Sequence, residues 1–465
     1  MKRLLIITTN YPPNLSIGTQ RILRICKYLD PSQWAVSVLT LKENYHPLPP
    51  GRAENGKLSY LDRVTVYRTH KFDLVFFLLN LRHAIRSRLV RGSVKQARPV
   101  FRLADSGDSE GAPRPEVAKW QGGWWQNLKD FITEIFQFPD KHVTWLPLAV
   151  LKGYRIIKKE RVDVIFSSSP SHSLHLISTI LKILTGKKLV VDFRDPWARS
   201  PWEAAERTLN AFERWKHRRI IAFERWVVSK ADQVTLITRQ MQQDFIRSYP
   251  GLPAEKFKFF SNGYDPESAS PPPAGGDQNG AKAGKVTFIH AGSLYKFRDP
   301  TPILYAVKNL AERGEIEREK ISFQFIGGVT PDLAHVPPLA KELGIADVVR
   351  FLPRVSYAKV MEMMAESQAL ILLQPLTKLQ LPGKFFDYLC LGKPIFAVAE
   401  KESATEAAVK EGFGVFADYN DVRDVEKGIL FLYQHPNYNL DFIREHRKRY
   451  DMSKSIETFR EILEL

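Results

Sequence analysis

The chain has 465 residues, of which 44% are apolar and 26% charged, which excludes a disordered chain and leaves room for two domains of about 200 residues each. Its 68 Lys and Arg residues outnumber 51 Asp and Glu residues, and the formal net charge of +17 favours an anionic partner, such as a nucleotide, a phospholipid surface or nucleic acid. The two cysteines, Cys26 and Cys390, exclude a disulfide framework, and no Cys/His cluster has the spacing of a zinc site, so we expect a reducing compartment.

The first predicted element is a strand at residues 4–9. Its apolar run ends at Ile7 and is too short for a signal peptide. The segment NYPPNLSIGTQR, residues 10–21, follows as a turn before the first helix. The most apolar stretch elsewhere, residues 74–81, is far shorter than the roughly 20 residues that a membrane-spanning helix needs. We therefore expect a chain that does not cross a membrane.

Further runs rich in β-branched residues predict strands at 36–41, 162–168, 188–193 and 233–238, separated by helix-length segments. Several of these runs are apolar on both faces, which is typical of parallel strands between two helix layers. They predict a doubly wound α/β domain over residues 1–266, interrupted by an irregular basic insertion at about 45–160.

Within that insertion, the apolar run 74–81 is followed by basic residues with no acidic residue among them. This pattern is typical of a helix that lies on an anionic membrane face. In that case residues 74–102 would contact the membrane. The alternative is a solvated basic helix whose Phe and Leu side chains pack on the domain. The basic residues are Arg82, Arg86, Arg88, Arg91, Lys95, Arg98 and Arg102.

Residues 267–284 are rich in Pro, Gly and Ala and predict a linker or a flexible loop. The strand pattern then restarts, which predicts a second doubly wound domain over residues 285–438. Ligands of open α/β sheets bind beyond the carboxyl ends of the strands, so we expect a ligand in the cleft between the two domains. The second set of strands is expected at 286–292, 321–327, 348–353, 369–375, 394–400 and 414–419.

The segment LQLPGKFFDYLCLGKPIFA, residues 379–397, carries the clearest chemistry. A Pro-Gly pair turns the chain after a predicted strand, and Gly392 ends the short helix that follows. Lys384 and Asp387 share one face at the amino end of this helix. The helix N–H groups and Lys384 suit a phosphate, and Asp387 can accept hydrogen bonds from two sugar hydroxyls. The alternative is a local ion pair worth a few tenths of a kcal/mol.

This segment resembles the donor-binding signature of GT-B glycosyltransferases of the GT4-like (glycosyltransferase group 1) family. Members carry a Pro-x-Lys-x-x-Glu-Tyr-x-x-x-Gly-Lys-Pro variant of an acidic Glu-x7-Glu motif. The resemblance implies that Gly383 and Lys384 are donor-binding residues and that Asp387 stands where the second acid binds the ribose. The first acidic position falls on Leu379, so that acid is absent.

Two loops extend the resemblance to both domains. NYPPNLSIGTQR is similar to the first loop of the family, which places Gly18 where the backbone approaches the donor phosphates. HAGSLYKFRDP, residues 290–300, resembles the first loop of the second domain, where a basic residue meets the diphosphate. Lys296 is the first candidate for that residue and Arg298 the second. An ordinary turn and solvated loop charges are the alternatives.

The resemblance also covers the boundary between the domains and the end of the chain. SNGYD, residues 261–265, is similar to the segment that leads into the second domain, so Asn262 and Gly263 are expected to form a hinge. Residues 439–465 have the periodicity of the C-terminal helix that returns to the first domain in this family.

DFRDPWARSPW, residues 192–202, resembles a motif of the same subfamily that places Arg194 and Asp195 at the cleft. Asp195 would orient or deprotonate the acceptor hydroxyl, and Arg194 would bind an anionic group. A purely structural Arg-Asp bridge is the alternative. His172 is a candidate on the acceptor side, with an ordinary loop histidine as its alternative.

No Asp-x-Asp sequence occurs, so nothing supports a metal-dependent grip on the diphosphate. The sequence also lacks G-x-G-x-x-G and G-x-x-x-x-G-K-[ST], which argues against a dinucleotide-dependent dehydrogenase and a P-loop NTPase. No RNA-binding aromatic motif or DNA-reading element accompanies the charge, so we expect no nucleic-acid partner.

These patterns predict an α/β protein with two Rossmann-like domains that moves a sugar from a nucleotide-diphosphate donor to a hydroxyl of a glycan or lipid-linked acceptor. The resemblance implies retention of configuration, no metal and no cofactor, and a role in cell-surface polysaccharide or glycolipid synthesis. We expect a cytoplasmic protein, with a peripheral position on the inner face of the membrane as an open alternative. A non-catalytic GT-B protein that binds nucleotide sugar or tethers other enzymes is the second hypothesis, and the missing acid at Leu379 supports it.

Overall fold

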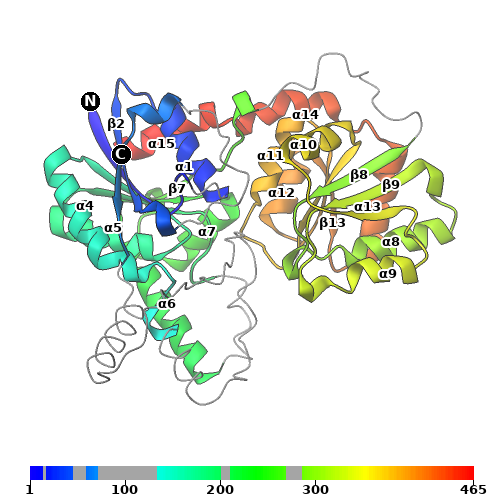
Figure 1. Cartoon of the computed structure of the whole chain (residues 1–465), viewed down its shortest axis with the longest axis horizontal. Coiled ribbons are helices and arrows are strands. Elements are labelled where there is room, and N and C mark those ends of the chain that lie inside the picture. The colour runs from blue at the N-terminus through cyan, green and yellow to red at the C-terminus, as the bar shows by residue number, and fades with distance from the viewer. Residues whose placement is uncertain (14–16, 46–58, 72–133, 200–209, 269–284) are drawn as a thin grey trace, which may run out of the picture. The chain divides into compact units, whose positions relative to one another are not determined.

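The computed structural model describes residues 1–13, 17–45, 59–71, 134–199, 210–268 and 285–465. Residues 74–102, for which membrane contact is predicted, lie outside the described residues, and so does most of the predicted linker 267–284. Figure 1 shows two sheets, each flanked by helices, which confirms the predicted α/β class.

The first sheet has seven strands in the order β3-β2-β1-β4-β5-β6-β7, and the pairings among β1 to β5 are parallel. All five strands predicted for this half are present. The prediction missed the third strand, which is only partly buried, and the seventh, which has three residues. The strands are β1 (Lys2–Ile7), β2 (Trp34–Leu41), β3 (Thr65–Thr69), β4 (Val164–Ser168), β5 (Lys188–Phe193), β6 (Gln233–Leu236) and β7 (Phe257–Phe259).

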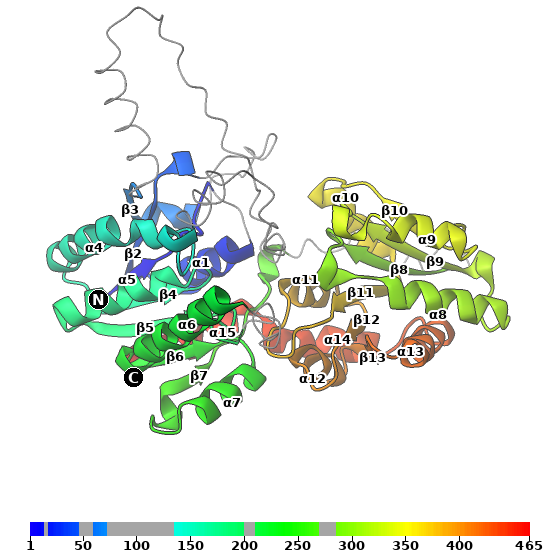
Figure 2. The same ribbon diagram turned by 90° about the horizontal axis from the view of Figure 1, so that it is seen from below.

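The helices of this half begin and end at residues that suit their roles. Gly186 ends one helix with a left-handed φ of 69°, and Thr238 caps another by accepting a hydrogen bond from the N–H of Met241. Figure 2 shows α4 and α5, which pack against each other. The helices are α1 (Ile17–Tyr28), α4 (Leu146–Glu160), α5 (Ser173–Thr185), α6 (Ala211–Lys230) and α7 (Arg239–Ser248).

The second sheet has six strands in the order β10-β9-β8-β11-β12-β13, and every pairing is parallel. Each strand overlaps its predicted position. The strands are β8 (Val286–Ala291), β9 (Ile321–Ile326), β10 (Val349–Leu352), β11 (Ala369–Gln374), β12 (Ile395–Ala399) and β13 (Gly414–Asp418). The helices are α8 (Thr301–Glu312), α9 (Val336–Glu342), α10 (Tyr357–Glu366), α11 (Gly383–Leu391), α12 (Ala404–Lys410), α13 (Val422–Gln434), α14 (Leu440–His446) and α15 (Met452–Glu464).

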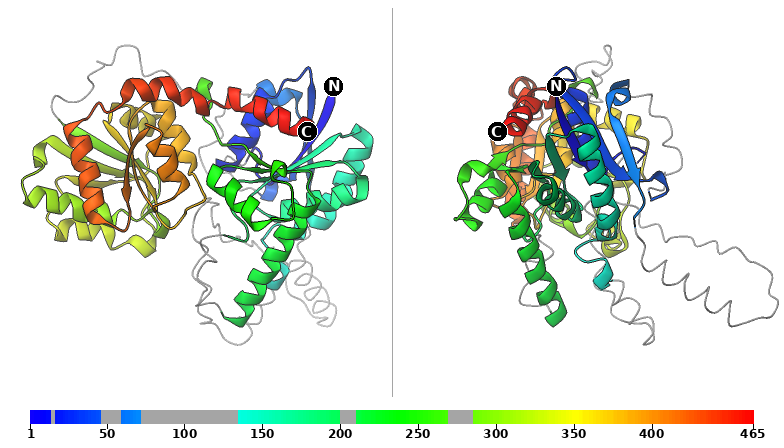
Figure 3. Two further views of the ribbon diagram at one scale, coloured as in Figure 1. Left: turned by 180° about the vertical axis from the view of Figure 1, so that it is seen from behind. Right: turned by 90° about the vertical axis from the view of Figure 1, so that its left-hand side faces the viewer.

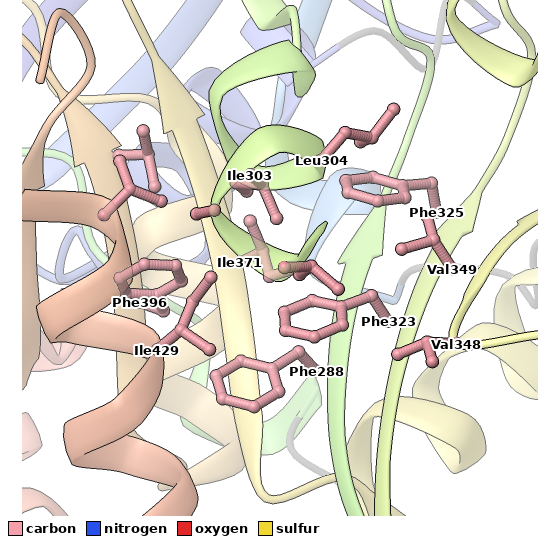
Figure 4. Close-up of a cluster of buried hydrophobic side chains, with 14 of the residues drawn as sticks. Phe288, Ile303, Leu304, Phe323, Phe325, Val348, Val349, Ile371, Phe396 and Ile429 are labelled. Carbon is pink, nitrogen blue, oxygen red and sulfur yellow. The ribbon is translucent and has the colours of Figure 1, made fainter. Parts of the chain in front are cut away.

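Two apolar cores lie on opposite faces of this second sheet. The core in Figure 4 packs α8, α9 and α13 against the strands, and the rings of Phe288 and Phe323 stack there with their centroids 4.7 Å apart. The other core packs α10, α11 and α12 against the opposite face. Neighbouring strands β8 and β11 are therefore covered on both sides, so a rigid sheet anchors the loops at their carboxyl ends.

Contacts divide the chain into two compact units. One unit contains Met1–Ala198 and Ala205–Val234, and the other contains Arg199–Ala204 and Thr235–Leu465. The predicted boundaries at residues 266, 284 and 438 stay predictions. Within the second unit, the C-terminal helix α15 contacts the end of β7, because the rings of Phe260 and Phe459 stack with centroids 4.9 Å apart.

Among the helices in the described ranges, none combines the length and the apolarity that a membrane span requires.

Candidate functional site

The candidate site begins at the amino end of α11, where Pro382 is the N-cap with φ −67° and makes no side-chain cap. The first-turn N–H groups are therefore not capped by an N-cap side chain, as they would be after Ser or Asp. The helix buries Phe385 and Leu389 and ends at Gly392, which adopts a left-handed φ of 65°. The predicted helix and its glycine stop are confirmed.

The side-chain amine of Lys384 lies 3.3 Å from Nε2 of His290, which is fully buried on β8. The other ring nitrogen of His290, Nδ1, lies 3.1 Å from the carbonyl oxygen of Ile371 on β11. A carbonyl can only accept, so Nδ1 carries the proton and Nε2 is left as an acceptor for the ammonium of Lys384. Burial and the nearby charges of Lys384 and Arg298 hold the pKa of His290 well below its ordinary value, which agrees with a neutral ring.

Arg298 joins Lys384 from the short helical turn Lys296–Arg298 after β8. Its guanidinium lies over the ring of Tyr295, 4.9 Å from the centroid. Burial and then the charge of Arg298 hold the pKa of Lys384 well below its ordinary value, and the carboxylate of Asp387 opposes this. Two cations therefore repel each other at this helix start, and one exposed carboxylate compensates them only in part.

Glycines after β8 and β9 allow close approaches around the Lys384 amine. Gly292 has φ +129°, and a Cβ on it would lie 2.2 Å from Nζ of Lys384 and 3.8 Å from Nη1 of Arg298. A Cβ on Gly327, whose φ is +149°, would lie 2.6 Å from the backbone carbon and oxygen of Gly292. The loops that carry them are joined by a hydrogen bond of 2.8 Å from the N–H of Leu294 to the carbonyl of Gly328. Only glycine fits where the side chain of Lys384 crosses the loop after β8.

A tyrosine fixes α11 to the sheet beside this cluster. The hydroxyl of Tyr388 donates a hydrogen bond to the carbonyl of Ile371 and accepts one from the N–H of Ala291, at 3.2 and 3.3 Å. The carbonyl of Ile371 therefore receives hydrogen bonds from both His290 and Tyr388. Strand β11 sets the positions of two residues that flank Lys384.

The structure places the two predicted basic residues of the β8 loop differently. Arg298 lies beside Lys384, whereas the backbone N–H of Lys296 donates to Oδ2 of Asp332 at 2.8 Å and its side chain is exposed. Burial opposes ionisation of Asp332, but hydrogen bonds from Thr330 and from the Lys296 backbone, with the charge of Lys296, outweigh it and lower the pKa of Asp332. The geometry therefore favours Arg298, the second candidate, over Lys296.

The missing acid of the motif is replaced by a partly buried leucine whose backbone is fixed. The hydroxyl of Thr238 donates a hydrogen bond of 2.7 Å to the carbonyl of Leu379. The same hydroxyl accepts from the N–H of Met241 and so caps α7. No carboxylate stands at position 379 to contact a ligand.

The predicted hinge residues are packed closely against the C-terminal segment of the same unit. A Cβ on Gly263 would lie 2.6 Å from the carbonyl oxygen of Tyr450. The N–H of Tyr264 donates to that carbonyl, and the N–H of Met452 donates to the carbonyl of Tyr264, both at 3.0 Å. Asn262 is partly buried beside them. This packing explains why position 263 is glycine, and the hinge stays a prediction.

In the first unit, the candidates Arg194 and Asp195 follow the end of β5. The N–H of Arg194 donates to the hydroxyl of Ser169 at 3.2 Å, and Arg194 is buried. Nε2 of His172 lies 3.2 Å from the backbone carbonyl of Asp195, and the His172 ring stacks on Trp197 with centroids 4.9 Å apart. Burial lowers the pKa of His172, so the ring is neutral and donates to that carbonyl. His172 therefore contacts the backbone of Asp195, and the cleft roles of both residues stay predictions.

A buried ion pair of the first unit was not predicted. Arg21 of α1 donates from Nε and Nη2 to the two oxygens of Asp192 on β5, each at 2.8 Å, and both side chains are almost fully buried. The hydroxyl of Ser168 donates to Oδ2 of Asp192 at 2.6 Å. Gly18 lies buried in the first turn of the same helix α1. This pair fixes the helix that follows the first loop to the strand before Arg194.

The prediction also missed His290 and Gly292. His290 contacts the amine of Lys384, and Gly292 leaves space for that amine. Both residues lie in the quoted loop HAGSLYKFRDP, and a glycine directly after a strand indicates a close approach of backbone and ligand or side chain. Gly292 at the end of the predicted strand is therefore the signal that predicts a close contact at the end of β8.

Two family models match the chain. The model described as Glycosyltransferase Family 4 matches residues 109–268, and the one described as Glycosyl transferases group 1 matches residues 276–449. Together the two ranges cover more than half of the chain. The D-inositol 3-phosphate glycosyltransferase of Streptomyces griseus is 25% identical over 212 residues, which cover 42% of this chain and 44% of that protein. The alignment thus spans less than half of that relative.

Solved structures match over the whole length. The structure of Anabaena Alr3699/HepE in complex with UDP is 13% identical, covers all of both chains and has a TM-score of 0.60. The sucrose-phosphate synthase of Thermosynechococcus elongatus is 11% identical, covers 99% of this chain and 98% of its own, and has a TM-score of 0.63. At these identities the likeness shows a shared fold.

Proposed function

Because the chain belongs to the GT4-like (glycosyltransferase group 1) family and has the GT-B fold, we propose that it transfers a sugar from a nucleotide-diphosphate donor to a hydroxyl of a glycan or lipid-linked acceptor. The observation that carries this proposal is the pair of cations at the start of α11. Lys384 and Arg298 converge beside a helix start without a side-chain cap, and Gly292 leaves the space that the Lys384 amine occupies. A pyrophosphate matches this arrangement in charge and in its need for N–H donors.

The proposed roles follow from the chemistry of the leaving group. When the bond to the sugar breaks, the nucleoside diphosphate gains negative charge, and Lys384, Arg298 and the N–H groups of α11 stabilise it. Each charge-assisted hydrogen bond is worth about 1.5–3 kcal/mol. Asp387, exposed three positions after Lys384 on the same helix, accepts hydrogen bonds from the ribose hydroxyls. The complex of HepE with UDP supports a nucleotide donor, and transfer with retention and without a metal is part of the proposal.

The acceptor side is assigned to the first unit. Asp195 orients or deprotonates the acceptor hydroxyl, and Arg194 binds an anionic group of the acceptor. The relative that is named a D-inositol 3-phosphate glycosyltransferase supports an acceptor with a phosphate. Gly18 contributes backbone to the donor phosphates, and Asn262 and Gly263 provide the hinge. A place in cell-surface polysaccharide or glycolipid synthesis rests on the family resemblance.

The experiment is a transfer assay on the full chain. UDP-sugars and GDP-sugars are incubated with glycolipid acceptors, and release of nucleoside diphosphate that depends on the acceptor is measured. Asp387→Ala should raise the donor KM, whereas Asp441→Ala, which removes an exposed carboxylate on α14, should not. Equal donor KM values for both variants would remove the role of Asp387.

The non-catalytic alternative rests on Leu379, which replaces the first acid of the motif. Under this alternative the chain binds the nucleotide sugar and transfers nothing. Calorimetric binding of a nucleotide sugar, with no product from any acceptor tested, would favour it. Transfer to a single acceptor would exclude it.

The proposed peripheral membrane position has support among the described residues at α6. Figure 3 shows α6 extending beyond the sheet of the first unit. Trp215 and Ile221 are 40% and 36% exposed on it, and Ile135 and Phe136 nearby are 40% and 43% exposed. Four exposed arginines accompany them, and Glu134 is paired with Lys216. Exposed aromatic side chains beside arginines suit an anionic lipid surface. The arginines are Arg214, Arg218, Arg219 and Arg225.

Vesicle flotation tests this position. The chain should float with phosphatidylglycerol vesicles and not with phosphatidylcholine vesicles, and reversing Arg214, Arg218 and Arg219 to Glu should abolish flotation. The matched control reverses three exposed cations of the second unit to Glu and should float normally. Equal flotation with both kinds of vesicle would contradict the membrane proposal. The same loss of flotation in the control variant would also contradict it. The control residues are Lys341, Arg350 and Lys427.

A further inference from the structure

His290 is a fully buried histidine whose two ring nitrogens face different partners, and the proposed transfer chemistry does not use it. We propose that His290 is a positioning residue for the donor diphosphate, because its Nε2 accepts a hydrogen bond from Lys384 and holds that amine at the start of α11. This inference rests on the proposed function. His290 itself is too deeply buried to touch a ligand and is not a catalytic residue.

The hydrogen bond to Ile371 determines what the ring can do. Nδ1 lies 3.1 Å from the carbonyl of Ile371 and must donate to it, so the neutral ring presents an unprotonated Nε2. A protonated ring would place a third cation beside Lys384 and Arg298. Strand β11 therefore sets the tautomer, and the tautomer makes Nε2 an acceptor for Lys384.

The backbone of Gly292 also lies close to the amine. Nζ of Lys384 lies 3.3 Å from His290 and would be 2.2 Å from a Cβ at position 292. The amine is thus held between a ring nitrogen and a glycine backbone. A long lysine side chain that is fixed before the ligand arrives loses less conformational freedom on binding, so its contact with a phosphate contributes more to affinity.

The charges around the amine give the inference a second consequence. Lys384 faces Arg298 after β8, His290 on β8 and Asp387 on its own helix, and Arg298 and Asp387 also act on Tyr388 of that helix. Burial and Arg298 lower the pKa of Lys384, and Asp387 opposes them. An acceptor at Nε2 stabilises the ammonium form. Removing that acceptor should therefore lower the pKa of Lys384 further and neutralise the amine at a lower pH.

Two isosteric variants separate positioning from structural support. An Asn side chain reproduces the donor of Nδ1, and a Gln side chain reproduces the position of Nε2. His290→Asn keeps the bond to Ile371 and loses the acceptor for Lys384, whereas His290→Gln does the opposite. Each variant loses one hydrogen bond, so a purely structural role predicts similar effects on ligand binding.

The experiment titrates the full-length variants with UDP and with GDP by calorimetry from neutral to alkaline pH. His290→Asn should raise the Kd of the nucleotide that binds about 3- to 10-fold, and His290→Gln should stay within about 2-fold of the wild type. The pH at which affinity begins to fall should move down in His290→Asn and remain in place in His290→Gln. Equal Kd values and equal pH profiles for the two variants would overturn the inference.

Two further measurements keep the outcomes distinct. If Lys384→Ala leaves nucleotide binding unchanged, the proposed site is wrong; if it weakens binding while His290→Asn does not, only the role of His290 is wrong. If neither His290 variant folds, ¹⁵N-histidine spectra of the wild type and Lys384→Met decide. The inference predicts that the signals assigned to His290 report protonation at Nδ1 and that its Nε2 resonance shifts in Lys384→Met. Protonation of His290 at Nε2, or an Nε2 resonance of His290 that stays in place in Lys384→Met, would contradict it.

Discussion

The side-chain amine of Lys384 lies 3.3 Å from Nε2 of His290, which is 94 positions earlier in the chain. This contact joins the start of α11 to the carboxyl end of β8. The loop after β8 supplies the second cation, Arg298, and the glycine that leaves space for the Lys384 amine. The proposed diphosphate site is therefore formed by the segments that follow β8 and β11 of one sheet. Its positive charge needs no residue of the first unit.

Substitution of Gly292 should weaken nucleotide binding. Gly292→Ala introduces a Cβ 2.2 Å from Nζ of Lys384 at a residue with φ +129°, so the amine must move. We expect a rise in the Kd of UDP or GDP of about 10-fold or more, since a charge-assisted bond is worth about 1.5–3 kcal/mol. Gly314→Ala is the control, because Gly314 also has a positive φ, +68°, with no atom within 4 Å of the added Cβ. Similar affinities for the two variants would show that the space at Gly292 is not needed.

The two basic residues of the β8 loop should differ in their effect on nucleotide affinity. Arg298 lies beside Lys384, whereas Lys296 is exposed and its backbone binds Asp332. Arg298→Ala should weaken binding by about 10-fold, and Lys296→Ala by less than about 3-fold, as measured by calorimetry. The reverse order would return Lys296 to the role that the sequence first suggested.

Nucleotide binding should take up protons. The pKa of Lys384 is lowered in the free protein by burial and by Arg298, and a bound diphosphate would raise it. Between the two pKa values, only the complex holds the proton, so affinity falls as pH rises through this window. Below the lower value Lys384 is charged in both states and contributes no pH dependence.

Calorimetry in buffers of different ionisation enthalpy measures this uptake. The measurement belongs above about pH 7, where the phosphates of the ligand are already ionised. Lys384→Met should remove the uptake, and His290, whose pKa is well below its ordinary value, should not contribute. Uptake that persists in Lys384→Met would assign the proton to another group.

The buried pair of Arg21 and Asp192 should be essential for the stability of the first unit. Replacing Arg21 by Met leaves a buried carboxylate without its two charged hydrogen bonds, which costs about 3–5 kcal/mol. Urea unfolding followed by tryptophan fluorescence should show this loss. Lys159→Ala, which removes an exposed cation 3.9 Å from Glu160, should change stability by less than about 1 kcal/mol. An equally small effect of Arg21→Met would mean that solvent or another cation replaces the pair.

Much of the fold was predictable because parallel strands covered on both faces are continuous apolar runs. The run 369–375 predicted β11, and Gly392 predicted the end of α11. β3 has a partly exposed pattern and β7 has three residues, so neither carries such a run. A strand that is buried on both faces needs a continuous run of apolar residues, which can be read from the sequence. A strand that is exposed or very short needs no such run and is missed.

The site was predictable only in its local part. Lys384 and Asp387 share a helix turn, and three-residue spacing places them on one face. The other contacts join residues far apart in the sequence. Lys384 contacts His290, and Arg21 pairs with Asp192. Arg298, and not Lys296, lies beside Lys384. Arg21 and Asp192 are 171 positions apart, and their pairing depends on which loop follows which strand at the sheet edge. Spacing in the sequence contains no information on such pairs.

Calorimetric titration of the full chain with UDP and GDP, for the wild type and for Lys384→Ala, decides whether the start of α11 binds the diphosphate. We predict that at least one nucleotide binds the wild type and that its Kd rises by about 10-fold or more in Lys384→Ala, since the variant loses a charge-assisted contact. Lys359→Ala, which removes an exposed cation on α10, should bind as the wild type does. Unchanged affinity in Lys384→Ala would contradict the assignment of the diphosphate to the start of α11.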